Sequence, residues 1–81
     1  MRAASIGPEE LGEGTMTGLM WDGMEGLYCV KNGVECVFCQ DDSGWTWYAN
    51  EKDGSFSTST CYFGTLEGAL ADFNENVDTD A

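Results

Sequence analysis

The sequence predicts an α+β fold, a four-stranded antiparallel β-meander with one C-terminal α-helix packed on one face. Asn32-Gly33 and Asp53-Gly54 are dipeptides typical of tight β-turns, and each lies between runs rich in β-branched, aromatic or hydroxyl residues. A turn-forming cluster at residues 40–44 separates the two central runs. After the last run, apolar residues recur at helical spacing over residues 66–73.

Residues 26–39 are the most clearly specified element, a β-hairpin centred on Asn32-Gly33. This dipeptide readily adopts the positive φ angles of a type I′ turn, so the register follows by counting outward from it. The predicted cross-strand pairs are Lys31 with Val34, Val30 with Glu35, Cys29 with Cys36, Tyr28 with Val37 and Leu27 with Phe38.

The rest of the sheet follows from the two later turns. A four-residue loop at 41–44 would place Phe38 opposite Trp47 and Cys36 opposite Ala49. A tight turn at Asp53-Gly54 would then place Trp47 opposite Thr60 and Thr46 opposite Cys61. Because side chains alternate between the faces of a sheet, this register predicts one apolar core face. Its members are Leu27, Cys29, Val34, Cys36, Phe38, Trp45, Trp47, Ala49, Thr58, Thr60 and Tyr62.

A helix is expected to follow the last strand and to lie across this core face. Thr65 is a favourable N-cap, and one helical stripe is apolar. The stripe consists of Leu66, Ala69, Leu70 and Phe73.

The domain organisation predicted from composition is a flexible N-terminal arm, or a single turn of helix, at residues 1–14, a single α+β domain at 15–76 and a frayed acidic tail at 77–81. The segment 15–26 fits a short helix or an edge strand equally well. Its apolar residues are expected to cover one face or edge of the sheet, and they are Met16, Leu19, Met20, Trp21 and Met24.

The composition is strongly acidic, with fifteen Asp and Glu against Arg2, Lys31 and Lys52, and a net charge of −12. Such an imbalance costs folding free energy through self-repulsion. Binding to phosphates needs clustered Lys and Arg, so the composition argues against direct nucleic-acid binding and against an anionic membrane. Residues 1–14 lack the apolar run of a signal peptide. We therefore expect a cytoplasmic protein with reduced thiols, in the host cell if a phage encodes it.

Four cysteines, spaced Cys-x6-Cys-x2-Cys-x21-Cys, raise the possibility of a zinc site at Cys29, Cys36, Cys39 and Cys61. The predicted register places the first two on the core face and the last two on the opposite face, so the four sulfurs would not converge on one metal. Small buried hydrophobic residues are the preferred interpretation. A Cys29 to Cys36 disulfide fits the cross-strand geometry but not a reducing compartment.

The sequence predicts no enzyme and no cofactor. The chain has no His, which excludes metal-histidine, Ser-His and Cys-His sites, and it has no glycine-rich phosphate loop. Asp41 and Asp42 could act as an acid/base pair, but adjacent acids at a turn are typical of solvated loop residues.

The acidic side chains are the remaining signal. Asp72 and Glu75 lie where they oppose the helix dipole, so local stability does not explain their positions. The turns and the helix are expected to form an almost continuous negative surface that binds a basic protein, with carboxylates in place of nucleic-acid phosphates. The candidate partner-binding residues are Asp41, Asp42, Glu51, Asp53, Glu67, Asp72 and Glu75.

In size, charge and lack of catalytic motifs, the chain resembles the small phage-encoded antagonists of bacterial defence, the anti-CRISPR and DNA-mimic anti-restriction proteins. This resemblance is compositional, and it implies an inhibitor of a nucleic-acid-binding protein without assigning a role to any residue. A structural or housekeeping domain whose acidity serves solubility or salt adaptation is the alternative, and a zinc-binding module is the third. The mixed face around Tyr28, Val30, Val37 and Tyr48 could also pair with a second copy of the chain.

Overall fold

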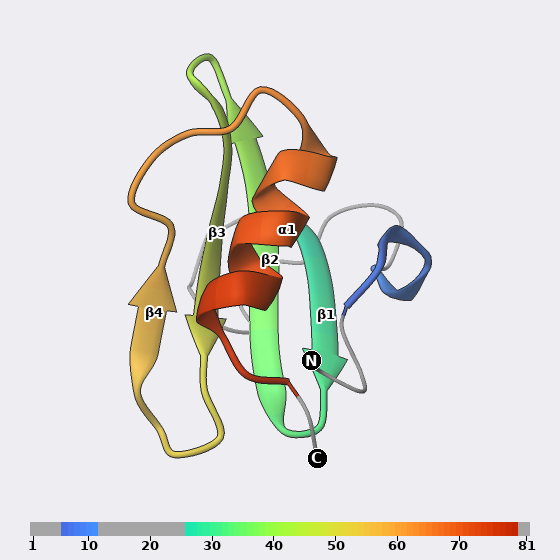
Figure 1. Cartoon of the computed structure of the whole chain (residues 1–81), viewed down its shortest axis with the longest axis vertical. Coiled ribbons are helices and arrows are strands. Elements are labelled where there is room, and N and C mark those ends of the chain that lie inside the picture. The colour runs from blue at the N-terminus through green and yellow to red at the C-terminus, as the bar shows by residue number, and fades with distance from the viewer. Residues whose placement is uncertain (1–5, 12–25, 80–81) are drawn as a thin grey trace.

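The computed structural model describes residues 6–11 and 26–79. A single 3-10 turn, η1 (Pro8–Glu10), precedes four strands, and a helix follows them. The strands are β1 (Leu27–Lys31), β2 (Val34–Asp41), β3 (Gly44–Asn50) and β4 (Phe56–Thr58), and the helix is α1 (Leu66–Asn76). The strands form one antiparallel sheet in the order β1-β2-β3-β4, and α1 crosses one face of it (Figure 1). The predicted fold class is confirmed.

The β1–β2 hairpin has the predicted turn and the predicted register. Asn32 and Gly33 both have positive φ, 52° and 84°, as a type I′ turn requires. Each cross-strand pair from Lys31 opposite Val34 to Leu27 opposite Phe38 is confirmed. The local preference of one dipeptide therefore sets the faces of two strands.

The β2–β3 pairing is also confirmed, with Phe38 opposite Trp47 and Cys36 opposite Ala49. Gly44 has a φ of 129°, and a Cβ at this position would lie 2.6 Å from the carbonyl oxygen of Phe63. Both the dihedral angle and the close backbone approach require glycine.

The predicted β3–β4 register is wrong by one residue. Tyr48 lies opposite Thr58 and Ala49 lies opposite Ser57, so neither Trp47 with Thr60 nor Thr46 with Cys61 forms a pair. The cause is the turn.

At this turn, the Gly54 N–H donates to the Glu51 carbonyl at 2.9 Å, and the Glu51 N–H donates to the Ser55 carbonyl at 2.8 Å. Gly54 alone has positive φ, 91°, which fits a three-residue loop ending in a left-handed glycine.

This one-residue shift reverses the faces of the last strand. Ser57 joins the core side, while Phe56 and Thr58 lie on the opposite face with Tyr48. Thr58, Thr60 and Tyr62, all predicted to lie on the core face, are exposed. Trp45 instead forms a bridge with Phe63.

The helix has the predicted cap and the predicted buried stripe. The Thr65 hydroxyl accepts a hydrogen bond from the Gly68 N–H at 3.1 Å. Phe73 is fully buried, and its ring lies edge-on to Phe38 at 5.5 Å and to Trp47 at 5.2 Å between centroids. The other stripe residues, Leu66, Ala69 and Leu70, also pack in the core.

Two chain ends that were expected to be mobile are docked on this core. Ile6 and Leu11 are buried, and the Ile6 backbone exchanges hydrogen bonds of 3.0 and 2.7 Å with the Asn74 side chain. Residues 6–11 therefore form the single helical turn η1 with its flanks, and they lie against the core. Val77 and Thr79 are fully buried, so residues 77–79 are not a frayed tail.

The apolar segment predicted to cover an edge or face, at residues 15–26, lies almost wholly outside the described residues. Within the parts of the chain that the structure describes, no helix is both long and apolar enough to cross a membrane.

Candidate functional site

The structure divides the candidate partner-binding carboxylates among three places. Asp41 and Asp42 lie at the β2–β3 turn, at the top of Figure 1, and Glu51 and Asp53 lie at the β3–β4 turn, at the opposite end of the sheet. Glu67, Asp72 and Glu75 lie along α1, which connects the two ends on one face.

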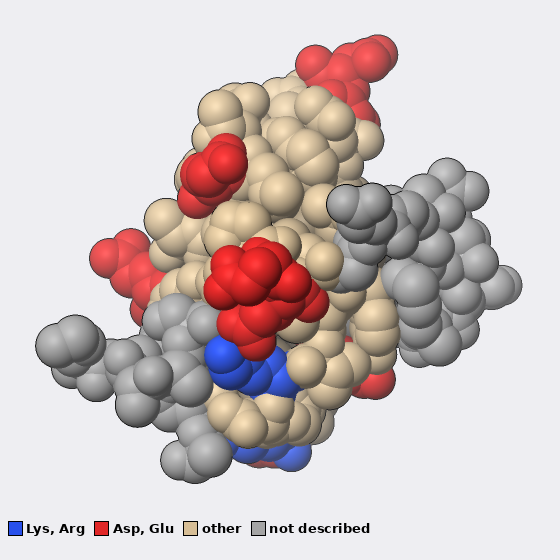
Figure 2. Space-filling view, turned by 90° about the vertical axis from the view of Figure 1, so that its right-hand side faces the viewer, with Lys and Arg blue, Asp and Glu red and all other residues tan. Residues whose placement is uncertain are grey.

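The negative surface is not continuous on the face seen in Figure 2. Acidic side chains form separate groups there with uncharged residues between them, and one group adjoins basic side chains. Lys31 forms an ion pair of 2.9 Å with Glu10, and this hydrogen bond holds the pKa of the Glu10 carboxyl below its ordinary value. The almost continuous negative surface was expected over the turns and the helix, and it stays a prediction.

The acids at the β3–β4 turn are held by neighbouring hydroxyls. Asp53 accepts hydrogen bonds from the Ser55 hydroxyl at 2.7 Å and from the Ser55 N–H at 2.9 Å, which lower the pKa of the Asp53 carboxyl. Glu51 accepts a hydrogen bond from the Ser57 hydroxyl. A surface hollow of about 350 Å³ is lined by Glu51, Lys52, Asp53 and Asp78, so a cation of this chain already lies among these carboxylates.

Asp72 has a structural role that sequence analysis did not find. Its Oδ2 accepts a hydrogen bond of 2.8 Å from Nε1 of Trp47, a side chain that is only 2% exposed. A buried indole N–H without a partner would cost free energy, so this contact stabilises the packing of α1 on β3. This role is a tertiary contact between residues 25 apart in the chain, which local helix stability does not supply.

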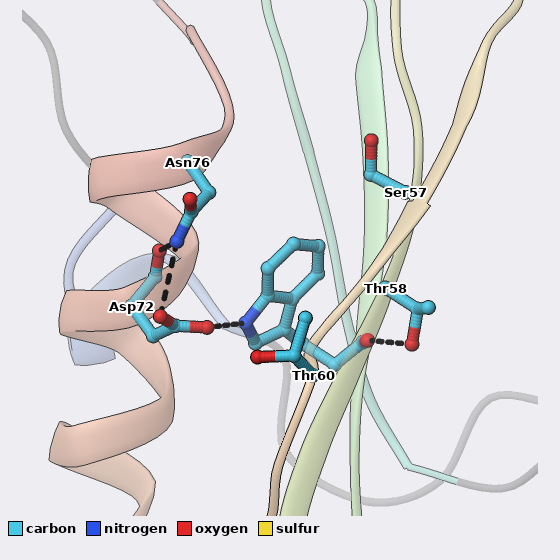
Figure 3. Close-up of a pocket in the computed structure, with 6 residues that line it drawn as sticks. Ser57, Thr58, Thr60, Asp72 and Asn76 are labelled. Carbon is cyan, nitrogen blue, oxygen red and sulfur yellow. Dashed lines mark hydrogen bonds between the residues drawn. The ribbon is translucent and has the colours of Figure 1, made fainter.

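A polar cleft opens beside this contact, between α1 and β4. It measures about 280 Å³ and is lined by Trp47, Ser57, Thr58, Thr60, Asp72 and Asn76. Figure 3 shows Asp72 and Asn76 on the helix wall, with Ser57, Thr58 and Thr60 on the other wall.

Hydrogen bonds hold the helix wall of the cleft in place. Asn76 Nδ2 donates to the Asp72 carbonyl at 2.8 Å and to Asp72 Oδ1 at 3.0 Å.

Sequence analysis missed this cleft in part because Ser57 reaches its strand wall only in the observed register. Ser57 was predicted to lie on the face away from the helix. The sequence did contain a signal for an exposed, polar edge here. Residues 57–60 are four consecutive Ser and Thr residues, a composition that is unusual for a buried strand.

The cysteines are free thiols divided between different environments. Cys29 and Cys36 are buried cross-strand neighbours on the helix side, Cys39 is half-buried on the opposite face, and Cys61 is exposed beyond β4. Burial raises the pKa of the Cys36 thiol far above its ordinary value, and it also raises the pKa of the Cys29 and Cys39 thiols. Over residues 6–11 and 26–79, no three His, Cys, Asp or Glu side chains are grouped so as to hold a metal ion.

The sheet face away from α1 carries the residues predicted to pair with a second copy. Val30 is 52% exposed, and Phe56, 51% exposed, joins this face because of the register shift. The Tyr28 hydroxyl donates to Glu35 at 3.1 Å, and burial followed by this contact raises the pKa of Tyr28. Pairing with a second copy stays a prediction.

No protein-family model, curated protein or solved structure matches this chain.

Proposed function

We propose that this chain is a non-enzymatic acidic protein that binds a basic surface of a nucleic-acid-binding protein and inhibits it. The observation that carries the proposal is the excess of twelve acidic over basic residues, from fifteen against three, in a domain whose turns and helix expose carboxylates. Exposed pairing cannot offset such an excess, so its cost in self-repulsion favours a role outside folding.

The exposed positions of these acids support the same proposal. Asp41, Asp42, Asp53, Glu67 and Glu75 are all exposed, at both ends of the sheet and along α1. The last turn of α1 carries no basic residue that would favour the helix dipole. A basic groove that normally holds phosphates would meet carboxylates at several points along a molecule 33 Å long.

The finer assignment, to antagonists of the anti-CRISPR or anti-restriction kind, rests on the resemblance in size and charge. Under this proposal the chain acts in the cytoplasm, competes with nucleic acid and needs neither a cofactor nor catalytic residues.

The test is competition between the chain and labelled duplex DNA for purified nucleic-acid-binding proteins, including CRISPR and restriction nucleases. The chain should displace DNA from at least one of them, and displacement should weaken as salt rises, because the Debye length is about 10 Å at 0.1 M. The matched variant changes Asp41, Asp42, Glu67 and Glu75 to the corresponding amides and keeps Asp72, which the core needs. This variant should fold and lose displacement.

The alternatives predict different results. If acidity only serves solubility, the chain displaces no DNA at any salt concentration, and the amide variant loses solubility instead. If the chain is a zinc module, elemental analysis of the purified protein finds stoichiometric zinc.

A further inference from the structure

The cleft between α1 and β4 presents mainly hydrogen-bond acceptors. Its indole N–H donates to Asp72, the Thr58 hydroxyl donates to the Trp47 carbonyl at 3.0 Å, and the Ser57 hydroxyl donates to Glu51. These hydrogens are therefore committed to the protein itself. What the same groups still offer to a ligand is oxygen lone pairs.

The helix wall has the same bias. Both neighbours of the Asn76 amide nitrogen are acceptors, the Asp72 carbonyl and carboxylate, so Nδ2 must face them and Oδ1 is left as the acceptor. The Asp72 carboxylate accepts one bond on each oxygen, and an ionised carboxylate can accept about four. Unused acceptor capacity and a negative charge therefore remain on this wall.

Across the cleft, the Thr60 side chain is exposed, and its hydroxyl points toward the helix on the side of Asp72 (Figure 3). The cleft therefore combines acceptors on two walls with one half-buried carboxylate. This chemistry favours a cationic group with several N–H donors over an anion or an apolar group.

We propose that this cleft binds the guanidinium group of an arginine side chain presented by the basic partner. This inference rests on the proposed function. It assigns to the cleft the most specific recognition of a basic side chain of the partner. The cleft's volume of about 280 Å³ leaves room for such a group.

Arginine is favoured over lysine by the position of the acceptors. A guanidinium spreads five N–H donors over a plane, so it can reach the helix wall and the strand wall together. An ammonium concentrates three donors on one nitrogen and is more strongly hydrated, so it loses more on entering a half-buried cleft.

The test measures binding of a hexa-arginine peptide to the whole chain, with the Trp47 indole N–H signal in a nitrogen-15 NMR spectrum as the local reporter. Asp72→Asn is the central variant: the asparagine oxygen can still accept from Trp47 Nε1, while the bond from Asn76 Nδ2 to the second oxygen is lost together with the charge. Glu67→Gln is the matched control, since it removes the same charge from an exposed position outside the cleft lining. Thr60→Val changes the strand wall at an exposed position.

The expected result is that Asp72→Asn weakens hexa-arginine binding by about fivefold, whereas Glu67→Gln weakens it by less than about twofold. Thr60→Val should weaken it by about twofold. The Trp47 indole signal should move on titration with hexa-arginine and move less with hexa-lysine.

Three outcomes would overturn the inference, and they separate it from the proposed function. If Asp72→Asn and Glu67→Gln weaken binding equally and the indole signal does not move, the cleft is not the binding site. A charge-driven interaction with the rest of the surface would still stand. Equal binding and equal indole shifts with hexa-lysine would remove the choice of arginine. Absence of any salt-dependent binding of hexa-arginine to the unmodified chain would contradict the inference and the proposed function together.

Discussion

The β1–β2 and β3–β4 hairpins both turn at a glycine that follows a short polar residue, but they turn differently. At Asn32-Gly33 both residues have positive φ, and the loop has two residues. At Asp53-Gly54 only the glycine does, and the loop spans three residues from Lys52 to Gly54. The extra residue reverses the faces of β4 relative to the predicted sheet.

The comparison shows that a turn signal in the sequence locates a hairpin more reliably than it sets its register. Asp53 does not adopt positive φ because its carboxylate caps the Ser55 N–H and hydroxyl two residues later, an arrangement typical of Asp in turns. The same shift brings Ser57 to the helix side, where it lines the cleft.

The largest expected difference between the two hairpins is the stability lost when one phenylalanine from each is truncated. Phe38→Ala should reduce the free energy of unfolding by about 3 to 5 kcal/mol, because Phe38 is fully buried against Phe73. Phe56→Ala should cost less than about 1 kcal/mol, since Phe56 is half-exposed and stacks on Tyr48 at the sheet surface. Urea unfolding of both variants measures this difference. Similar losses of unfolding free energy in the two variants would mean that both hairpins contribute equally to the stability of the core.

Giving the first turn the Asp-Gly dipeptide of the second should have a smaller effect on stability. Asn32→Asp should reduce the free energy of unfolding by about 2 kcal/mol, because the Asn32 amide donates to the Thr79 carbonyl at 2.6 Å and a carboxylate cannot. Asn32→Gly is the control, because glycine keeps the turn and loses only the hydrogen bond. If Asn32→Asp unfolds at the same urea concentration as the native chain, the contact with Thr79 contributes nothing.

The opposite exchange gives the β3–β4 turn the Asn-Gly dipeptide of the β1–β2 turn. Asp53→Asn creates Asn-Gly but should keep the three-residue loop, because an asparagine oxygen can still accept from Ser55. The stability change should stay within about 0.5 kcal/mol. Nuclear Overhauser contacts between Tyr48 and Thr58 report the register, and their replacement by contacts one residue away would show that the dipeptide alone selects the turn.

The smallest expected effect is on the acid titration of the Asp53 carboxyl in the β3–β4 turn. Hydrogen bonds from Ser55 lower the folded-state pKa of Asp53, so their contribution is present above the unfolded value, about 3.9, and is lost as pH falls through the lower folded value. Ser55→Ala should raise the pKa of Asp53 and remove part of this dependence. Carboxyl titration by NMR measures it, and an unchanged Asp53 titration would show that the Ser55 hydroxyl does not hold the carboxylate.

Much of the fold follows from short-range signals. The Asn-Gly turn, the Thr65 cap and the 66–73 stripe each depend on neighbouring residues, and each is present in the structure. The candidate site was less predictable. Asp72 could be named as an acid near a helix C-terminus, but its bond to Trp47 joins residues 25 apart in the chain.

The sequence by itself determined the strand order, the register of β1 to β3, the helix and the acidic charge, because local turn geometry, side-chain periodicity and composition act without knowledge of distant contacts. Only the tertiary structure decided the register of β4, the docking of residues 6–11 and 77–79, and the cleft between α1 and β4. Each of these depends on which distant groups satisfy a backbone or side-chain polar group or cover an apolar side chain. Asn74 with Ile6, Asn32 with Thr79 and Asp72 with Trp47 are such pairs.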